Sequence, residues 1–214
     1  MNEEIQMRTV FWNVDTQFDF MRKEGKLYVP DAELIEPVLA RLTGLAKDYG
    51  LKVINTGDSH HAGSHEISAN PDFVRTFPEH CMYGTAGADF VHATRPQDAY
   101  RLDWRDQTLD EKAVISHRNI VLTKDVFDVF GKPGGSPHVD AVLELLRPER
   151  AIVYGVATNV CVDFAVEGLL ERKIEVYVVR DAIKGLPGIT DPTEKWTAGG
   201  AKLIEAATID QYVR

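Results

Sequence analysis

Three residue types that together suit hydrolysis of an amide lie far apart in this chain: Cys161, Lys124 and Asp15. A cysteine attacks a carbonyl as the thiolate, and a free thiol with a pKa of about 8.5 supplies only a few per cent of that form. A lysine ammonium within about 4–6 Å favours the thiolate. A carboxylate can take the thiol proton, deliver it to a leaving amine and then activate water. These residues predict cysteine-based nucleophilic catalysis if the fold brings them together.

The stretch "GVATNVC", which ends at Cys161, predicts a turn from a buried strand into a helix. Either Thr158 or Asn159 can cap that helix, which would put Cys161 in the first turn, where the macrodipole favours negative charge. The glycine and small residues allow close backbone approach and can aim amide N–H groups at a developing oxyanion. Taken alone, the stretch fits a buried, inert cysteine equally well.

Histidines gather in one part of the chain. Five of the seven fall between His60 and His92, and most of them lie in an irregular segment from Asp58 to Phe90. Structureless stretches of this length inside a domain are usually functional or disordered. The segment is therefore a candidate metal site, with a solvated surface loop as the alternative. The remaining histidines, His117 and His138, make a Cys–His pair the less favoured alternative to Asp15.

Alternating strands and helices are expected to position these residues. Near-continuous, β-branched apolar runs predict a mainly parallel sheet of about six strands with helices on both faces, a three-layer, doubly wound α/β fold. The expected strands are residues 9–15, 51–58, 119–125, 150–156, 174–181 and a short one within 201–210, and the expected helices are residues 31–50, 136–149 and 158–173. In the first helix, Asp31 is expected as the cap, Gly50 as the end, and Leu34, Val38, Leu42 and Leu45 as one apolar face.

Binding sites of such sheets lie outside the carboxyl ends of the strands. Polar or reactive residues occupy five expected strand ends: Asp15, Asp58, Lys124, Cys161 and Asp181. Each alone is explained by a cap or a turn, but five at one edge predict a functional site.

Composition and charge limit the classes of binding partner and indicate the cellular compartment. The net charge of −9 argues against a nucleic-acid partner, which requires a basic face. The sequence contains no apolar run of 18 residues, so no membrane-spanning helix is predicted. The stretch "MNEEIQMRTVFW" lacks the basic-then-apolar layout of a secretory signal, so none is expected. Two cysteines in 214 residues indicate a reduced, cytoplasmic protein, although a Cys81–Cys161 bridge stays open at this point.

Three groups of residues resemble the isochorismatase-like cysteine hydrolase superfamily: "NVDTQFDF", "LTKDVFDVF" and "YGVATNVCVDFAVEGLLERKIEVYVVRDAIKG". "NTGDSH" and "TFPEHCMYGTAGADF" resemble its nicotinamidase (pyrazinamidase) branch. The resemblance runs from about Thr9 to about Gly185. It implies one cysteine hydrolase domain over residues 1–214, with a metal-binding loop at about 58–90.

The resemblance also implies roles for individual residues. Asp15, Lys124 and Cys161 would form the catalytic triad. The peptide bond between Val156 and Ala157 would be cis, and the N–H groups of Ala157 and Cys161 would form the oxyanion hole.

A metal site follows from the same resemblance, with Asp58, His60 and His80 as ligands. This donor set suits Zn²⁺ first, with Mn²⁺ or Fe²⁺ as alternatives. Some members have a fourth protein ligand, but His65 and Glu66 match its spacing poorly and neither is assigned.

Phe20, Phe77 and Phe127 map to the substrate walls of the family, and aromatic walls suit a flat ring. Phe77 and Phe127 stand where the family often has Trp and Tyr, and "MYGT" replaces the more usual aliphatic-Gln pair before Gly-Thr.

The resemblance therefore implies a metal-dependent amidase that converts nicotinamide to nicotinate and ammonia through a cysteine thioester. It also implies a homo-oligomer. An amidase acting on another small amide, such as a carbamoyl or ureido compound, is the alternative. A non-catalytic binding or metal-sensing protein is disfavoured by the intact triad, and vinyl-ether chemistry is less expected because that branch does not need the metal ligands.

Overall fold

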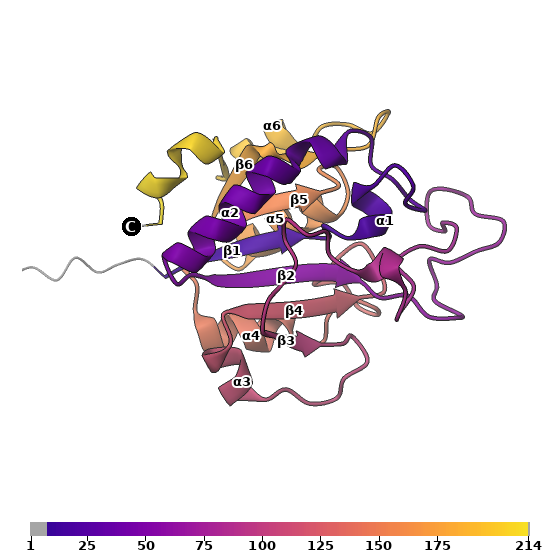
Figure 1. The fold of residues 1–214 in the computed structure, drawn as a ribbon, viewed down its shortest axis with the longest axis horizontal. Helices are drawn as coiled ribbons and strands as arrows, with labels where there is room; N and C mark the ends of the chain where they lie inside the picture. The colour runs from indigo at the N-terminus through magenta and orange to yellow at the C-terminus, as the bar shows by residue number, and fades with distance from the viewer. Residues whose placement is uncertain (1–7, 214) are drawn as a thin grey trace, which may run out of the picture.

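Apolar, β-branched runs form one seven-stranded sheet in the computed structural model, which describes residues 8–213 (Figure 1). The strands lie in the order β3-β4-β2-β1-β5-β6-β7, and every neighbouring pair is parallel. Their bounds are β1 (Thr9–Val14), β2 (Lys52–Asp58), β3 (Ala99–Leu102), β4 (Asn119–Lys124), β5 (Arg150–Val156), β6 (Glu175–Lys184) and β7 (Lys202–Ile204).

Helices cover both faces of this sheet (Figure 1). They are α1 (Phe18–Met21), α2 (Glu36–Asp48), α3 (Glu111–Ser116), α4 (Val139–Leu146), α5 (Cys161–Glu171) and α6 (Thr193–Ala198), with 3₁₀ turns at Ala32–Ile35, Ala86–Ala88 and Ala206–Gln211. Side chains alternate across each strand, so Trp12 of β1 packs in the core under α3 to α6, whereas Phe11 packs in the core under α1 and α2. The predicted three-layer, doubly wound fold is confirmed.

The sheet has one strand more than the six that the sequence predicts. The additional strand is β3. Only Leu102 of its four residues is buried, so its sequence, AYRL, lacks the continuous apolar run that marks the other strands. At the other edge, the expected strand within 201–210 is confined to β7, and the residues after it form the 3₁₀ turn Ala206–Gln211.

The first predicted helix is correct in place but wrong in two details. Asp31 makes no side-chain cap and has a φ of 61°, because the segment opens with the 3₁₀ turn Ala32–Ile35. That turn also shifts the buried face. Of the four residues expected on it, only Leu42 is fully buried, while Leu34 is 64% exposed. Gly50 follows the helix at a φ of 64°, a conformation that suits glycine, as expected for the end.

Between β2 and β3, residues 59–98 form a long segment that is irregular apart from the 3₁₀ turn Ala86–Ala88. Cys81 of this segment and Cys161 are both free thiols, so the open question of a bridge between them is answered. Within residues 8–213, no helix has both the length and the apolar character needed to cross a membrane.

Candidate active site

The carboxyl ends of β1, β2 and β4 bring three charged side chains together. Asp58 and Lys124 are register partners at the ends of β2 and β4, and the N–H of Asp15 donates to the carbonyl of Thr56 at 3.1 Å. Gly155 lets β5 lie close beside this point. It has a φ of +122°, and a Cβ there would lie 2.0 Å from the Val14 carbonyl oxygen.

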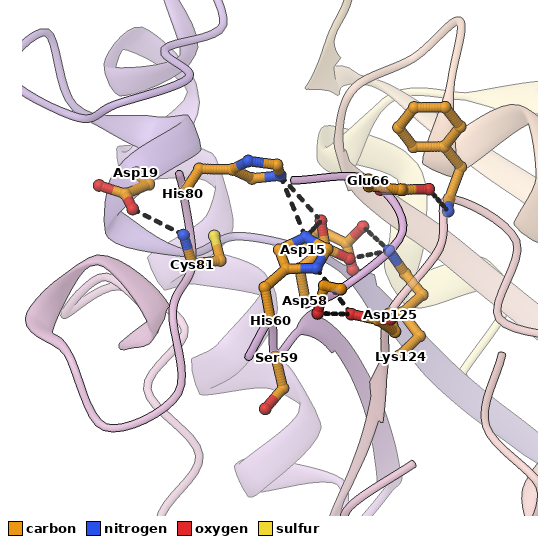
Figure 2. Close-up of polar contacts among 12 residues, drawn as sticks. Asp15, Asp19, Asp58, Ser59, His60, Glu66, His80, Cys81, Lys124 and Asp125 are labelled. Atoms are coloured by element: carbon orange, nitrogen blue, oxygen red, sulfur yellow. Dashed lines mark hydrogen bonds and ion pairs between the residues drawn. The ribbon is translucent and has the colours of Figure 1, made fainter. Parts of the chain in front are cut away.

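The ammonium group of Lys124 lies between the two carboxylates and the cysteine. Its Nζ is 2.8 Å from Oδ2 of Asp15, donates to Oδ1 of Asp58, and lies 3.7 Å from Sγ of Cys161 (Figure 2 shows the two carboxylate contacts). Lys124 is 1% exposed. Burial would lower the pKa of Lys124, but the two carboxylates outweigh it and hold that pKa well above its usual range. Lys124 therefore stays a cation in a buried site.

Burial acts in the same direction on the pKa of both carboxylates, but the neighbouring charges outweigh it only at one of them. Burial raises the pKa of Asp15, and the opposing effect of Lys124 does not cancel it. For Asp58, burial also acts to raise the pKa, but Lys124 and the neighbouring imidazoles outweigh it and hold that pKa well below the usual range. Asp15 is thus the carboxylate that accepts a proton more readily.

Cys161 is the first residue of α5 and so lies in the first turn, as predicted, but neither Thr158 nor Asn159 caps this helix. Val160 occupies the cap position without a side-chain hydrogen bond, and the amide of Asn159 instead donates to the Leu186 carbonyl at 2.8 Å. The N–H of Cys161 is one of those that a helix start leaves without an intrahelical acceptor. Burial raises the pKa of the Cys161 thiol well above its usual range, and Lys124 opposes that shift. The thiol therefore needs a proton acceptor before it can attack.

The peptide bond between Val156 and Ala157 is cis, which confirms the prediction. Ala157 and Cys161 both line the same cavity. The backbone N–H groups predicted to form the oxyanion hole thus belong to two residues of one cavity wall.

A cluster of possible metal ligands adjoins Lys124. One ligand atom from each of Asp58, His60 and His80 lies within 4.8 Å of the others, and all three residues are buried (Figure 2). The two Nε2 atoms are 3.2 Å apart and lie 3.7 and 3.8 Å from Oδ2 of Asp58. Two nitrogens on one tetrahedral Zn²⁺ lie about 3.3 Å apart, given Zn–N distances of about 2.0–2.1 Å.

Hydrogen bonds at the far side of each imidazole decide which nitrogen is free. Nδ1 of His80 lies 2.8 Å from the Pro78 carbonyl oxygen, which can only accept, and Nδ1 of His60 lies 2.9 Å from Oδ1 of Asp125. In the neutral rings the proton is then on Nδ1, and each Nε2 presents a lone pair toward the other. This arrangement of donors fits a divalent metal ion held by Asp58, His60 and His80.

Glu66 lies beside this cluster without belonging to it. Its Oε1 accepts from the Phe127 N–H at 3.1 Å (Figure 2), while its Oε2 is buried without a hydrogen-bond partner among the described residues. Burial, together with the charge of Asp58, raises the pKa of Glu66 to about 7. His65, the other residue considered for a fourth ligand, is exposed.

Several residues that the sequence analysis did not single out hold this site in place. The Gln17 side chain donates to the Asp58 carbonyl and accepts from the Asp58 N–H, both at 2.7 Å. Thr56 donates to Oδ1 of Asp15 at 2.7 Å, and Oδ2 of Asp19 accepts from the N–H that follows His80 at 2.7 Å. For Gln17 and Asp19 the available signal was the density of polar residues in "DTQFD", directly after a buried strand at the edge where binding sites of such sheets lie.

Not every predicted site residue reaches the site. Asp181 lies within β6, which continues to Lys184, and its Oδ1 accepts from the Ala206 N–H at 2.9 Å. For Asp181, the explanation by a cap or a turn is therefore correct, because it binds a backbone N–H at the start of a 3₁₀ turn. The Cys–His alternative is also absent, since His117 and His138 bond to the carbonyls of Ala113 and Asp106.

A cavity of about 350 Å³ opens onto the thiol. The three predicted wall residues line it together with the reactive side chains: Phe20, Phe77, Phe127, Asp58, His80 and Cys161. The rings of Phe77 and Phe127 meet edge to face with centroids 5.4 Å apart. The predicted wall residues therefore share one cavity with the thiol and with part of the metal-ligand cluster.

Comparison with known proteins identifies the family of this chain. The isochorismatase domain model matches residues 9–198. The nicotinamidase/pyrazinamidase of Mycobacterium tuberculosis is 27% identical over 184 residues, which cover 83% of this chain and 87% of that protein.

Two solved structures show the same fold. The pyrazinamidase of Pyrococcus horikoshii in complex with zinc has a TM-score of 0.70 at 24% identity, covering 92% of this chain and 99% of that one. N-carbamoylsarcosine amidase from Thermoplasma acidophilum has a TM-score of 0.72 at 20% identity, covering 95% and 99%. Because the family model spans most of the residues, the chain belongs to the isochorismatase domain family and is a hydrolase.

Proposed function

We propose that this enzyme is a metal-dependent amidase that hydrolyses nicotinamide to nicotinate and ammonia. It is an amide-bond hydrolase, and the proposal concerns its substrate and the residues that act. The observation that supports it best is the contact of Lys124 with Asp15, Asp58 and Cys161 at one end of an aromatic-walled cavity. The 27% identical relative is a nicotinamidase/pyrazinamidase.

In the first half of the reaction, Asp15 takes the proton of the Cys161 thiol, and the raised pKa of Asp15 suits it to this task. Lys124 stabilises the thiolate. The sulfur bonds to the carboxamide carbon, and the oxyanion is held by the N–H groups of Ala157 and Cys161. Asp15 then gives its proton to the amide nitrogen, the carbon–nitrogen bond breaks, and ammonia leaves a thioester.

In the second half, Asp15 accepts a proton from the water that attacks the thioester carbon. The carbon–sulfur bond breaks, and the sulfur leaves as the thiolate beside Lys124. Asp15 returns its proton to that sulfur, which restores the thiol and releases the acid.

Asp58, His60 and His80 would hold the metal, with Zn²⁺ as the proposed ion. When bound, the ion supplies a Lewis acid that anchors a nitrogen or oxygen of the substrate. Asp58 links the two parts of the site, because Oδ1 accepts from Lys124 while Oδ2 faces the imidazoles. Loss of Asp58 is therefore expected to disturb the position of the Lys124 ammonium as well as the metal site.

An amidase acting on a carbamoyl or ureido compound is the second candidate, consistent with the shared fold of N-carbamoylsarcosine amidase. The cavity favours nicotinamide. The polar side chains among its lining residues are Asp58, His80 and Cys161, so no lysine or arginine lines it to pair with the carboxylate of a carbamoyl amino acid.

The test is ammonia release from nicotinamide by the zinc-loaded enzyme, with trapping of the acyl-enzyme by hydroxylamine. Cys161→Ala is expected to abolish both ammonia and hydroxamate formation while retaining the metal. Ammonia release that survives this substitution would contradict the covalent mechanism. Turnover of a ureido compound without turnover of nicotinamide would favour the second candidate.

We further propose that a single domain over residues 1–214 assembles as a homo-oligomer in the cytoplasm and serves pyridine nucleotide salvage. The two free thiols agree with a reducing compartment.

A further inference from the structure

The outer end of the cavity is apolar and faces solvent. Phe73, Val74 and Ile189, here called the rim, all line the cavity and are 64%, 73% and 49% exposed. Among the described residues, eight large hydrophobic side chains are exposed, and the rim holds three of them. Exposed apolar side chains that gather in one place mark a binding surface more often than single scattered ones do.

The first part of the rim is held in a defined turn. Asp72 accepts through Oδ1 from the N–H groups of Val74, Arg75 and Thr76 at 2.8–2.9 Å. These bonds hold the pKa of Asp72 below its usual range. Phe73 has a φ of 55°, which bulky residues rarely adopt. The turn thus presents Phe73 and Val74 outward in a fixed conformation.

The second part of the rim is held by the residue next to the thiol turn. The Asn159 amide donates to the carbonyls of Leu186 and Ile189 at 2.8 and 3.1 Å and accepts from the Leu186 N–H at 2.9 Å. Asn159, one of the two residues that the sequence offered as a helix cap, instead fastens the segment that carries Ile189 to the start of α5. The second part of the rim is therefore fixed relative to Cys161, whereas the first part is fixed within its own turn.

The cavity also has more room than a single ring requires. Its volume of about 350 Å³ lies within the range of about 300–1,000 Å³ that is typical of sites for drug-sized ligands, which exceed an unsubstituted pyridine carboxamide. Its polar side chains lie at the inner end with the thiol, and its outer end is apolar.

From these observations we propose that the preferred substrate is an aromatic carboxamide with an apolar substituent that reaches from the ring to the rim. This inference rests on the proposed amidase function and narrows its substrate class. The carboxamide lies at Cys161, the ring lies against Phe77 and Phe127, and the substituent covers Phe73, Val74 and Ile189.

The test compares kcat/KM for nicotinamide with kcat/KM for its 5-propyl and 6-propyl derivatives, using the zinc-loaded enzyme. Because a single methylene in an apolar pocket changes kcat/KM by about 10-fold or more, at least one propyl derivative is expected to exceed nicotinamide by at least about 10-fold. The double variant Phe73→Ser/Val74→Ser is expected to reduce that ratio to near one. Ile115→Ser, at an equally exposed apolar residue on α3, is the matched control and should leave the ratio unchanged.

The possible outcomes distinguish failure of this inference from failure of the proposed function. If nicotinamide is hydrolysed faster than both propyl derivatives, the substrate class is wrong while the proposed function stands. If only a propyl derivative is hydrolysed, the inference holds and nicotinamide is wrong as the substrate. Hydrolysis of none of the three contradicts both proposals. If the double variant changes the oligomeric state and leaves the ratio intact, the rim is a contact between copies of the chain.

Discussion

The two ends of the cavity are built by opposite means. At the inner end, four buried side chains of the proposed catalytic site lie at the ends of strands and at the start of a helix, three of them in contact with the ammonium of the fourth. They are Asp15, Asp58, Cys161 and Lys124, here called the reaction centre. At the outer end, the rim lies on loops, exposed to solvent, with its backbone fastened by Asp72 and Asn159.

This difference separates two requirements of an enzyme. The reaction centre depends on buried charges that tolerate little displacement, so it rests on the sheet. The proposed selection of the substrate depends on apolar side chains whose identity can change without disturbing those charges, so it rests on loops. Substitutions at the two ends should therefore fail in different ways.

The largest effect is expected at Lys124. Lys124→Met leaves Asp15 and Asp58 facing each other without a cation, and breaking a buried ion pair costs about 3–5 kcal/mol of unfolding free energy. Urea denaturation measures this loss, and ammonia release should disappear as well. The control Lys202→Met removes an exposed ion pair with Glu175, which is expected to cost less than about 1 kcal/mol. Equal losses in the two variants would contradict the importance of burial.

Next in size is the loss of a metal ligand. His80→Ala is expected to weaken zinc binding by at least about 100-fold, because even the outer-shell partners of metal ligands change affinity by about 10–100-fold. Metal analysis after dialysis against a competing chelator measures it. His92→Ala, at an exposed histidine outside the cluster, should keep the metal. Unchanged zinc content in His80→Ala would reject the ligand assignment.

A smaller effect is expected at Thr56, whose hydroxyl donates to Asp15. That bond stabilises the carboxylate and so lowers the pKa of Asp15. In Thr56→Val the pKa of Asp15 rises further, the acidic limb of the kcat profile moves to higher pH, and kcat falls by roughly 10-fold. Thr43→Val removes a hydroxyl bonded to two carbonyls away from the reaction centre and should leave the profile in place. An unshifted acidic limb in Thr56→Val would argue against Asp15 as the base.

The smallest effect is expected at Asp72 in the turn of the rim. Asp72→Ala should raise KM for the propyl amides by a few-fold, because the turn no longer fixes Phe73 and Val74, with kcat for nicotinamide nearly unchanged. The pKa of Asp72 is lowered in the folded protein, so its stabilising bonds are fully present above the unfolded pKa of 3.8. The ratio of KM between Asp72→Ala and the unsubstituted enzyme should therefore stay constant from about pH 5 to 9. The control Asp110→Ala removes a carboxylate that likewise accepts from backbone N–H groups, at the start of α3, and should leave KM for the propyl amides unchanged.

Much of the fold was predictable from residue patterns, because buried parallel strands are continuous apolar runs. β3 was missed for the same reason: an edge strand with half-exposed residues carries no such run. The buried face of the first helix was wrong. Leu34 lies in the 3₁₀ turn that opens the segment, where the angle between successive side chains differs from that of an α-helix, and the α-helix itself buries Leu39, Leu42 and Ala46. Asp181 shows that a carboxylate near an expected strand end can serve a backbone N–H elsewhere.

The sequence by itself determined the doubly wound sheet and the nearness of Asp15, Asp58 and Lys124, because parallel strands all end at one edge. It also indicated Cys161 at a helix start. Only the tertiary structure decided how the charges divide between the carboxylates, which nitrogen each imidazole offers, and that Asn159 holds the rim rather than the helix. Those properties depend on burial and on hydrogen-bond partners far apart in the chain, which local patterns do not specify.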